Sequence, residues 1–280
     1  MKTLILSDIH ANLAALEAVL EAERTWDEVF FLGDAVGGGP NPDEVLNVLR
    51  GLNGVFVRGN HDHEIIGSVH APEDRSTMHA LTEVPRRIRR KIRDMFHSGH
   101  AEAYNPDYVW RLWTKQQISE ANREFLASFV ETAHVERAGL TIRLIHGNIP
   151  EEWGYGSRIW PDSPEDVFNR LSERYPERYI VLGHSHVQFR KEIGGRVFIN
   201  SGGLGQPRLE KPFAAYIVLA ERGFDLRAVP YDTEKTAEAM DRVGIKDEAF
   251  VQAWKACYRK AVLPERSRMR DLTVFENDHL

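Results

Sequence analysis

The sequence predicts an α/β protein: a layered α/β/β/α sandwich of two mixed sheets that carries a helical insertion. Three observations favour this class. Apolar runs alternate with helical patterns over residues 1–62, as in parallel βαβ units. Glycine turns separate paired strand-like runs in the second half, which adds antiparallel hairpins. The 280 residues, of which 42% are hydrophobic, suffice to bury one large core.

The first half supplies the parallel units. Leu13, Leu16, Val19 and Leu20 recur on one side of a predicted helix. Pro40-Asn41-Pro42 is a start signal for the next helix. The expected strands cover 2–7, 28–32 and 54–58, and the expected helices cover 12–24 and about 42–50.

Residues 63–133 interrupt this rhythm and carry no motif. Met78, Leu81 and Ile88 recur at helical spacing, and a second helical stretch runs from about 116 to 130. We therefore expect 63–133 to be a helical insertion or cap within a single domain that spans 1–280.

Strands return after residue 133. Two hairpins are expected at Gly194-Gly195 and around Gly223. A charged tail over 263–280 is expected to be loose. The expected strands are 134–138, 141–145, 178–182, 187–193, 196–200, 213–220 and 224–230, and the expected helices lie near 164–174, 233–242 and 246–262.

Composition excludes several classes of protein. The net charge of −6 gives no general attraction to nucleic acid or anionic membranes. Cys257 is the single cysteine, so an intrachain disulfide and a thiolate cluster are both excluded. The apolar run after Lys2 stops at Asp8, unlike a signal peptide, and no stretch approaches the roughly 18 apolar residues of a membrane span. We expect a cytoplasmic protein.

Five short motifs each follow, or lie close behind, an apolar run that predicts a buried strand. Groups at strand ends lie where open α/β sheets place their ligand sites. The motifs supply imidazole, carboxylate and amide groups and no sulfur, a set that suits Mn, Fe, Zn or Ni. They are Asp8-Ile9-His10, Gly33-Asp34, Gly59-Asn60-His61-Asp62, His146-Gly147-Asn148 and Gly183-His184-Ser185-His186.

In this order, the motifs resemble those of the calcineurin-like metallophosphoesterase family, over roughly residues 1–62 and 140–230. The resemblance implies two divalent metal ions and in-line attack on phosphorus by a hydroxide that bridges them. Asp8, His10 and His186 would bind the first ion, Asp34 would bridge, and Asn60, His146 and His184 would complete the second site.

The predicted catalytic residues are His61 and the adjacent Asp62. In the family, the histidine at the position of His61 binds no metal, and it protonates the leaving oxygen or binds phosphate. Where the protein serine/threonine phosphatase branch has an Asp and a phosphate-gripping Arg, this chain has Ala35-Val36-Gly37-Gly38-Gly39. This departure favours the branch of prokaryotic-type phosphodiesterases and dinucleoside polyphosphatases, which the stretch 202–208 also resembles.

The expected partner is a small phosphorylated, nucleotide-like substrate, and the oligomeric state stays open. Trp153 and Tyr155, in the loop after His146, are candidate substrate-binding residues, although such aromatics can also merely cover the edge of a core. Three alternatives remain: a phosphomonoesterase, a non-catalytic metal-binding scaffold, and a nuclease that uses the basic run 86–93. Helical spacing within that run instead favours a solvated helix face.

Overall fold

The computed structural model describes residues 1–66, 106–147, 158–206, 212–245 and 248–261. The first sheet has the strand order β10-β9-β1-β2-β3. Its centre is parallel, because β1 pairs with β2 and β2 pairs with β3 in the same direction. The hairpin of β9 and β10 adds an antiparallel edge. The strands are β1 (Thr3–Leu6), β2 (Glu28–Phe31), β3 (Gly54–Phe56), β9 (Phe213–Ala220) and β10 (Gly223–Pro230).

The second sheet has the order β4-β5-β6-β8-β7. Its centre is also parallel, since β6 lies between β5 and β8 and runs in the same direction as both. Antiparallel pairs with β4 and β7 complete it on either side. The strands are β4 (Thr132–Arg137), β5 (Leu140–Ile145), β6 (Tyr179–Leu182), β7 (Phe189–Ile193) and β8 (Arg196–Asn200).

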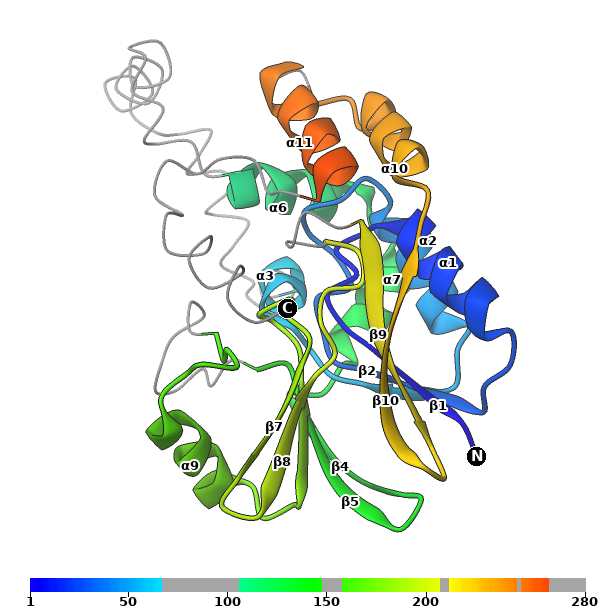
Figure 1. The fold of residues 1–280 in the computed structure, drawn as a ribbon. Coiled ribbons are helices and arrows are strands. Elements are labelled where there is room, and N and C mark those ends of the chain that lie inside the picture. The colour runs from blue at the N-terminus through cyan, green and yellow to red at the C-terminus, as the bar shows by residue number, and fades with distance from the viewer. Residues whose placement is uncertain (67–105, 148–157, 207–211, 246–247, 262–280) are drawn as a thin grey trace.

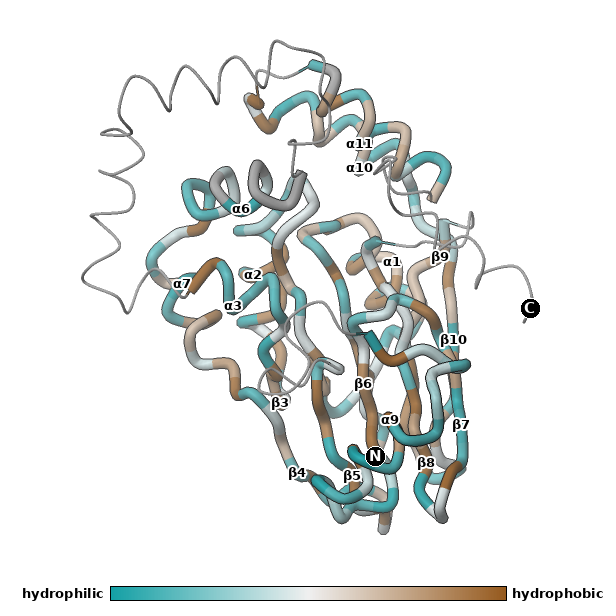
Figure 2. Tube along the Cα trace, turned by 90° about the vertical axis from the view of Figure 1, so that its left-hand side faces the viewer, coloured by the Kyte–Doolittle hydropathy of each residue, from teal (hydrophilic) through white to brown (hydrophobic). Residues whose placement is uncertain are grey.

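The two sheets pack face to face, with helices outside them (Figure 1). Ile5 and Phe30 of the first sheet share an inner apolar layer with Leu144 of the second. Their neighbours along the strand, such as Leu4 and Phe31, point to the other face, because side chains alternate along a strand. Figure 2 shows hydrophobic stretches of β5 and β6 running through the interior of the molecule.

The outer layers are helical. Helices α1 (Leu13–Glu23) and α2 (Pro42–Arg50) cover the outer face of the first sheet, together with α7 (Glu120–Ala127). Helix α9 (Glu165–Arg174) covers the outer face of the second sheet through Phe168 and Leu171. The predicted α/β/β/α sandwich of two mixed sheets is therefore confirmed.

A further apolar cluster, separate from those of the two sheets, joins helices that are far apart in the sequence. Trp110 of α6 (Pro106–Gln117) packs against Trp254 of α11 (Glu248–Lys260), with a centroid distance of 5.5 Å. Helix α10 (Thr233–Ala239) and the short 3₁₀ turn Met240–Arg242 precede α11 and complete this helical group beside the first sheet (Figure 1).

One predicted helix is wrong in its extent. Instead of one helix over 116–130, α6 ends at Gln117 and α7 begins at Glu120. Ser119 between them has an extended backbone and donates its N–H to Asp43 Oδ1 at 2.7 Å, so a polar contact with α2 separates the two helices.

Several predictions fall outside the described residues. These are Met78, Leu81, Ile88, the basic run 86–93, Trp153, Tyr155 and the tail 263–280. The single domain and the boundaries of the helical insertion remain predictions. Helix α3 (Asn60–Ile66) opens the segment predicted as the insertion. Within the described part of the chain, no helix is both long and apolar enough to span a bilayer.

Candidate metal centre

The candidate residues meet because parallel strands end at the same side of their sheets. Asp8 and His10 follow β1, and Asp34 follows β2. Asn60 begins α3, after β3. In the second sheet, His146 follows β5, while His184 and His186 follow β6. All seven side chains are buried or nearly so.

The backbone at these positions is unusual. Asp8, His10, Asp34, His184 and His186 all have positive φ angles, between 47° and 67°. Non-glycine residues rarely adopt this left-handed conformation, which commonly marks functional sites. The turns after the strands are therefore held in strained shapes that direct these side chains toward one another.

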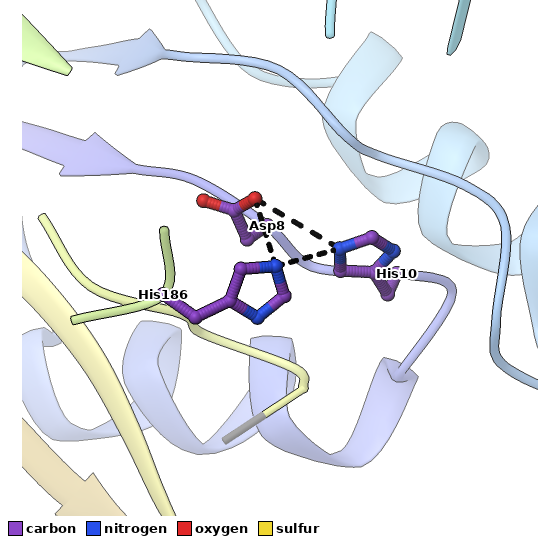
Figure 3. A group of neighbouring side chains, drawn as sticks. All are labelled: Asp8, His10 and His186. Atoms are coloured by element: carbon purple, nitrogen blue, oxygen red, sulfur yellow. Dashed lines mark hydrogen bonds and ion pairs between the residues drawn. The ribbon is translucent and has the colours of Figure 1, made fainter. Parts of the chain in front are cut away.

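The first group joins β1 to the loop after β6. His186 Nε2 lies 3.2 Å from Asp8 Oδ1 and 3.2 Å from His10 Nε2. His10 Nε2 lies 3.8 Å from the same carboxylate oxygen. Figure 3 shows the three side chains pointing toward a common centre. Their ligand-type atoms lie close enough together to hold one metal ion.

The second group joins β2 to the ends of β5 and β6. Asp34, His146 and His184 bring one ligand atom each within 4.8 Å of one another. Asn60 Oδ1 lies 3.1 Å from His146 Nε2 and adds a neutral oxygen to this group.

Asp34 lies between the two groups. Its Oδ2 is 3.3 Å from His146 Nε2 in the second group and 3.6 Å from His10 Nε2 in the first. Its other oxygen accepts the backbone N–H of His61 at 2.9 Å, which fixes the orientation of the carboxylate. One carboxylate oxygen thus faces histidines of both groups.

The histidines are oriented by backbone carbonyls behind them. The Nδ1 atoms of His10, His146 and His186 lie 2.7, 2.8 and 2.7 Å from the carbonyl oxygens of Gly37, Leu32 and Gln206. A carbonyl oxygen only accepts hydrogen bonds, so each Nδ1 carries the proton and each Nε2 faces inward. Such outer partners are typical of metal-binding histidines.

This arrangement fits divalent metal ions. Among the residues that the structure describes, two buried side-chain atoms at this centre, Asp8 Oδ1 and His184 Nε2, have no hydrogen-bond partner, an arrangement that is costly unless a cation contacts them. The remaining oxygen of Asp8 is satisfied, because it accepts from Ser7 Oγ at 2.6 Å and from the N–H of His184 at 2.9 Å. Asp8 therefore turns one oxygen toward the centre.

The pKa values of the buried carboxylates and histidines indicate that the centre of the site favours a positive charge. Burial opposes ionisation of Asp8 and Asp34, but neighbouring histidines outweigh it and hold both pKa values well below the usual range. Burial lowers the pKa of His10 and His184, and the cations of His146 and Arg158 lower that of His184 further. Burial also opposes the charged form of His146, but the charge and hydrogen bond of Asp34, with smaller contributions from Asp8 and the carbonyl of Leu32, outweigh burial and raise the pKa to about 9.

The structure places His61 at the rim of the two groups. Its ring meets that of His10 edge-on, with centroids 4.8 Å apart, and it is only half-buried. A ligand atom of His61 also lies close to His10 and Asp34, so that geometry alone would allow it to bind a metal. Its role as a non-ligand remains a prediction.

Asp62 faces the backbone. Its carboxylate accepts the N–H groups of Asp34, Ala35 and Gly59 at 2.8, 2.9 and 3.0 Å, and the side chain is fully buried. Its predicted catalytic role is untested, and this geometry suits a residue that orients the turn carrying Asp34. Burial, and then the charge of Asp34, raise the pKa of Asp62 to about 6.

Some supporting residues were not anticipated. Asn200 at the end of β8 donates Nδ2 to the carbonyl of Gly183 at 2.6 Å and to Ser185 Oγ at 3.1 Å, which stabilises the turn that carries His184 and His186. A lone Asn after an apolar run offers no signal in the sequence. For Ser7, the only signal in the sequence was its position next to Asp8, the first residue of a motif.

Comparison with known proteins agrees with this geometry. Residues 1–223 match the model of the calcineurin-like phosphoesterase superfamily domain. An uncharacterized protein from Methanocaldococcus jannaschii is 32% identical over 255 residues, which are 84% of this chain and 89% of that protein. A metallophosphoesterase structure from Sphaerobacter thermophilus covers 94% of this chain and 100% of its own, with a TM-score of 0.65 and 24% identity, a likeness of fold.

A shorter match involves an enzyme of stated activity. A symmetrical bis(5'-nucleosyl)-tetraphosphatase from Coxiella burnetii is 36% identical over 94 residues. The matched part is 31% of this chain and 32% of that enzyme. This similarity therefore concerns about a third of either protein.

Proposed function

Because this chain belongs to the calcineurin-like phosphoesterase superfamily of metal-dependent phosphoric ester hydrolases, we propose that it hydrolyses phosphodiester or phosphoanhydride bonds of small, nucleotide-like substrates at a dinuclear metal centre. The observation that carries the proposal is the position of Asp34, whose Oδ2 faces His10 of one ligand group and His146 of the other. A shared carboxylate between two sets of ligands is what a pair of adjacent ions requires.

The ligands divide between two ions in this proposal. Asp8, His10 and His186 would hold the first, and Asn60, His146 and His184 would hold the second, with Asp34 available to both. Divalent ions bound there would supply an activated water as nucleophile and offset the charge that develops on the phosphoryl oxygens. The residues also agree in chemistry, since oxygen and imidazole donors without sulfur suit Mn, Fe, Zn or Ni.

His61 donates a proton to the leaving oxygen in this proposal. Its half-buried ring at the rim lets it reach substrate, whereas the ligand side chains behind it are covered. The hydrogen bond from its backbone N–H to Asp34 Oδ1 fixes the start of α3 relative to the metal ligands. A proton donor held this way can act as a general acid.

Substrate choice follows from the loop after Asp34. Residues 35–39 are small or apolar and fully buried, so this loop carries no side chain that could grip a dianionic monoester. A diester or an anhydride has less charge at the attacked phosphorus and a second substituent for binding. The partial similarity to the tetraphosphatase from Coxiella burnetii supports a nucleotide-like substituent. Trp153 and Tyr155 remain candidates to stack on a base, which is worth about 1–3 kcal/mol.

A hydrolysis panel tests this proposal. Purified protein with added Mn²⁺ is assayed on nitrophenyl phosphate, bis-nitrophenyl phosphate, a dinucleoside tetraphosphate and oligonucleotides. We expect kcat/KM for the diester or the tetraphosphate to exceed that for the monoester at least about tenfold, or 1.4 kcal/mol in the barrier. Equal or better turnover of the monoester would establish a phosphomonoesterase, and preferential cleavage of oligonucleotides a nuclease. Mn²⁺ binding without any turnover would indicate a scaffold.

A further inference from the structure

The helices at the C-terminal side of the domain contact the loops of the candidate metal centre. Helices α10 and α11 lie beyond residues 1–223, the part that matches the family model. Even so, Thr236 Oγ1 of α10 donates to Asn12 Oδ1 at 2.8 Å, and Asn12 Nδ2 donates to the carbonyl of Gly205 at 2.7 Å. In α11, the hydroxyl of Tyr258 donates to the carbonyl of Gly38.

The loop that Tyr258 contacts consists of three consecutive glycines, Gly37–Gly39. Gly37 and Gly38 have φ angles of 84° and 89°. A Cβ at Gly38 would lie 2.8 Å from Gln206 Nε2, and one at Gly39 would lie 2.0 Å from the carbonyl oxygen of His10. Glycine is therefore required here, but it also has the greatest freedom of any residue. Contacts from outside must hold such a loop in place.

The position of this loop determines how His10 is oriented. The carbonyl of Gly37 accepts the hydrogen bond from His10 Nδ1 at 2.7 Å. This bond places the proton on Nδ1 and turns Nε2 toward Asp8, Asp34 and His186. If the loop moved, His10 would lose the bond that selects its tautomer and its ring orientation.

Tyr258 is suited to hold the loop because it is itself fixed. Its side chain is only 1% exposed, and burial raises the pKa of its phenol well above the usual value, so the hydroxyl keeps its proton. Trp254, one turn earlier in α11, lies 3.7 Å from the position of a Cβ on Gly38. It also packs against Trp110 of α6 at 5.5 Å. The aromatic cluster of α6 and α11 thus anchors Tyr258.

We propose that Tyr258 is a positioning residue of the metal centre: its hydroxyl fixes the Gly37–Gly39 loop, and the Gly37 carbonyl then holds His10 with Nε2 toward the first ion. The inference rests on the proposed metal centre. The alternative is a purely structural role, in which Tyr258 only fills the core of the helical group. The two differ in what loss of one hydroxyl does, since the ring alone fills the core.

The experiment compares wild type, Tyr258→Phe and Cys257→Ala. Cys257 is the adjacent buried residue of α11 in the same cluster and serves as the matched control for packing. Metal-free protein is titrated with Mn²⁺ in a calorimeter, and the tautomer of His10 is followed by long-range ¹H–¹⁵N NMR of the imidazole. Melting temperatures verify that each variant is folded. If Tyr258→Phe cannot be purified, the wild type still tests the inference, because its His10 must then show the single Nδ1–H tautomer that the Gly37 carbonyl selects.

We expect Tyr258→Phe to weaken one Mn²⁺ site about tenfold, the lower end of the effect of removing an outer partner of a metal ligand. His10 should then lose its single Nδ1–H tautomer, while Cys257→Ala keeps both properties. Wild-type Mn²⁺ affinity and an unchanged His10 tautomer in the variant would overturn the inference. Failure of the wild type to bind Mn²⁺ would instead refute the proposed metal centre, so the two failures are distinguishable.

Discussion

Replacing Asp34 by Asn tests the bridge between the two proposed ions. The substitution keeps the shape of the side chain and an oxygen that can accept the N–H of His61, as Asp34 Oδ1 does at 2.9 Å. It removes the negative charge that faces His10 and His146 at 3.6 and 3.3 Å. A neutral amide is a poor ligand for two cations, so both metal sites should weaken.

The size of the effect can be worked out from His146. Burial disfavours the charged form of its imidazole, and yet Asp34 raises its pKa from 6.5 to about 9. Asp34 makes the largest favourable contribution, and Asp8 and the carbonyl of Leu32 add to it. Together these groups stabilise a single positive charge on His146 by on the order of 3 kcal/mol. A divalent ion in the same place should gain no less. We expect Asp34→Asn to lower the affinity for Mn²⁺ at least about a hundredfold.

Calorimetric titration of metal-free protein with Mn²⁺, checked by metal analysis after gel filtration, measures this effect. Asp43→Asn is the matched control, because Asp43 is a carboxylate that accepts a backbone N–H, that of Ser119, on the side of α2 facing α7. The control should bind Mn²⁺ as the wild type does. Two ions still bound tightly by Asp34→Asn would refute the bridge, and loss of one ion alone would assign Asp34 to a single site.

Three further predictions concern other groups. The His61→Ala variant should keep its metals and lose about 10²–10⁴-fold in kcat, with a smaller loss for substrates that have a nitrophenol leaving group. A uniform loss across leaving groups would indicate that His61 binds phosphate. Loss of metal from the variant would indicate that His61 is a metal ligand. The pKa of His146 is about 9, so its imidazolium must lose a proton when a metal ion binds. Calorimetry at pH 7.5 in buffers of different ionisation enthalpy should therefore detect the release of about one proton. Detection of no released proton would contradict the assignment of His146 as a ligand. At Asp43, burial opposes ionisation, but the N–H of Ser119, further hydrogen bonds from the side chains of Asn122 and Ser119, and the charge of Arg50 together outweigh it and lower the pKa. The stabilisation from Asp43 should therefore be complete above its usual pKa and decline as pH falls toward the lowered one. Urea unfolding of Asp43→Asn should show a smaller deficit in the free energy of unfolding at pH 3 than at pH 7, and equal deficits would count against it.

Much of the fold could be predicted because local patterns agree with it. Fully buried strands such as Leu4-Ile5-Leu6 read as continuous apolar runs, and the turn glycines Gly194 and Gly195 lie where a hairpin reverses direction. The helix over 116–130 was wrong because its interruption at Ser119 depends on Asp43, a residue 76 positions away. Contacts at such separation leave no trace in local periodicity.

The residues of the candidate site also fall into those that local sequence patterns could predict and those that they could not. Its ligand-type residues were found because each lies within a short motif close to the end of a strand. The contacts behind them were missed, because Asn200 and Tyr258 carry no motif and look like ordinary residues of a strand end and an amphipathic helix. For Asp62 the motif named the residue but could not show that its carboxylate faces backbone N–H groups.

The left-handed backbone at five of the candidate ligands has a consequence for how this protein changes over generations. Each such residue costs on the order of 1 kcal/mol or more, which together is a large part of a typical stability of about 5–15 kcal/mol. Glycine would relieve the backbone strain at Asp8, His10 or Asp34, so in a lineage with no use for the site random substitution would drift toward residues that adopt this conformation at less cost. The five side chains persist against that drift only while selection acts on what they bind.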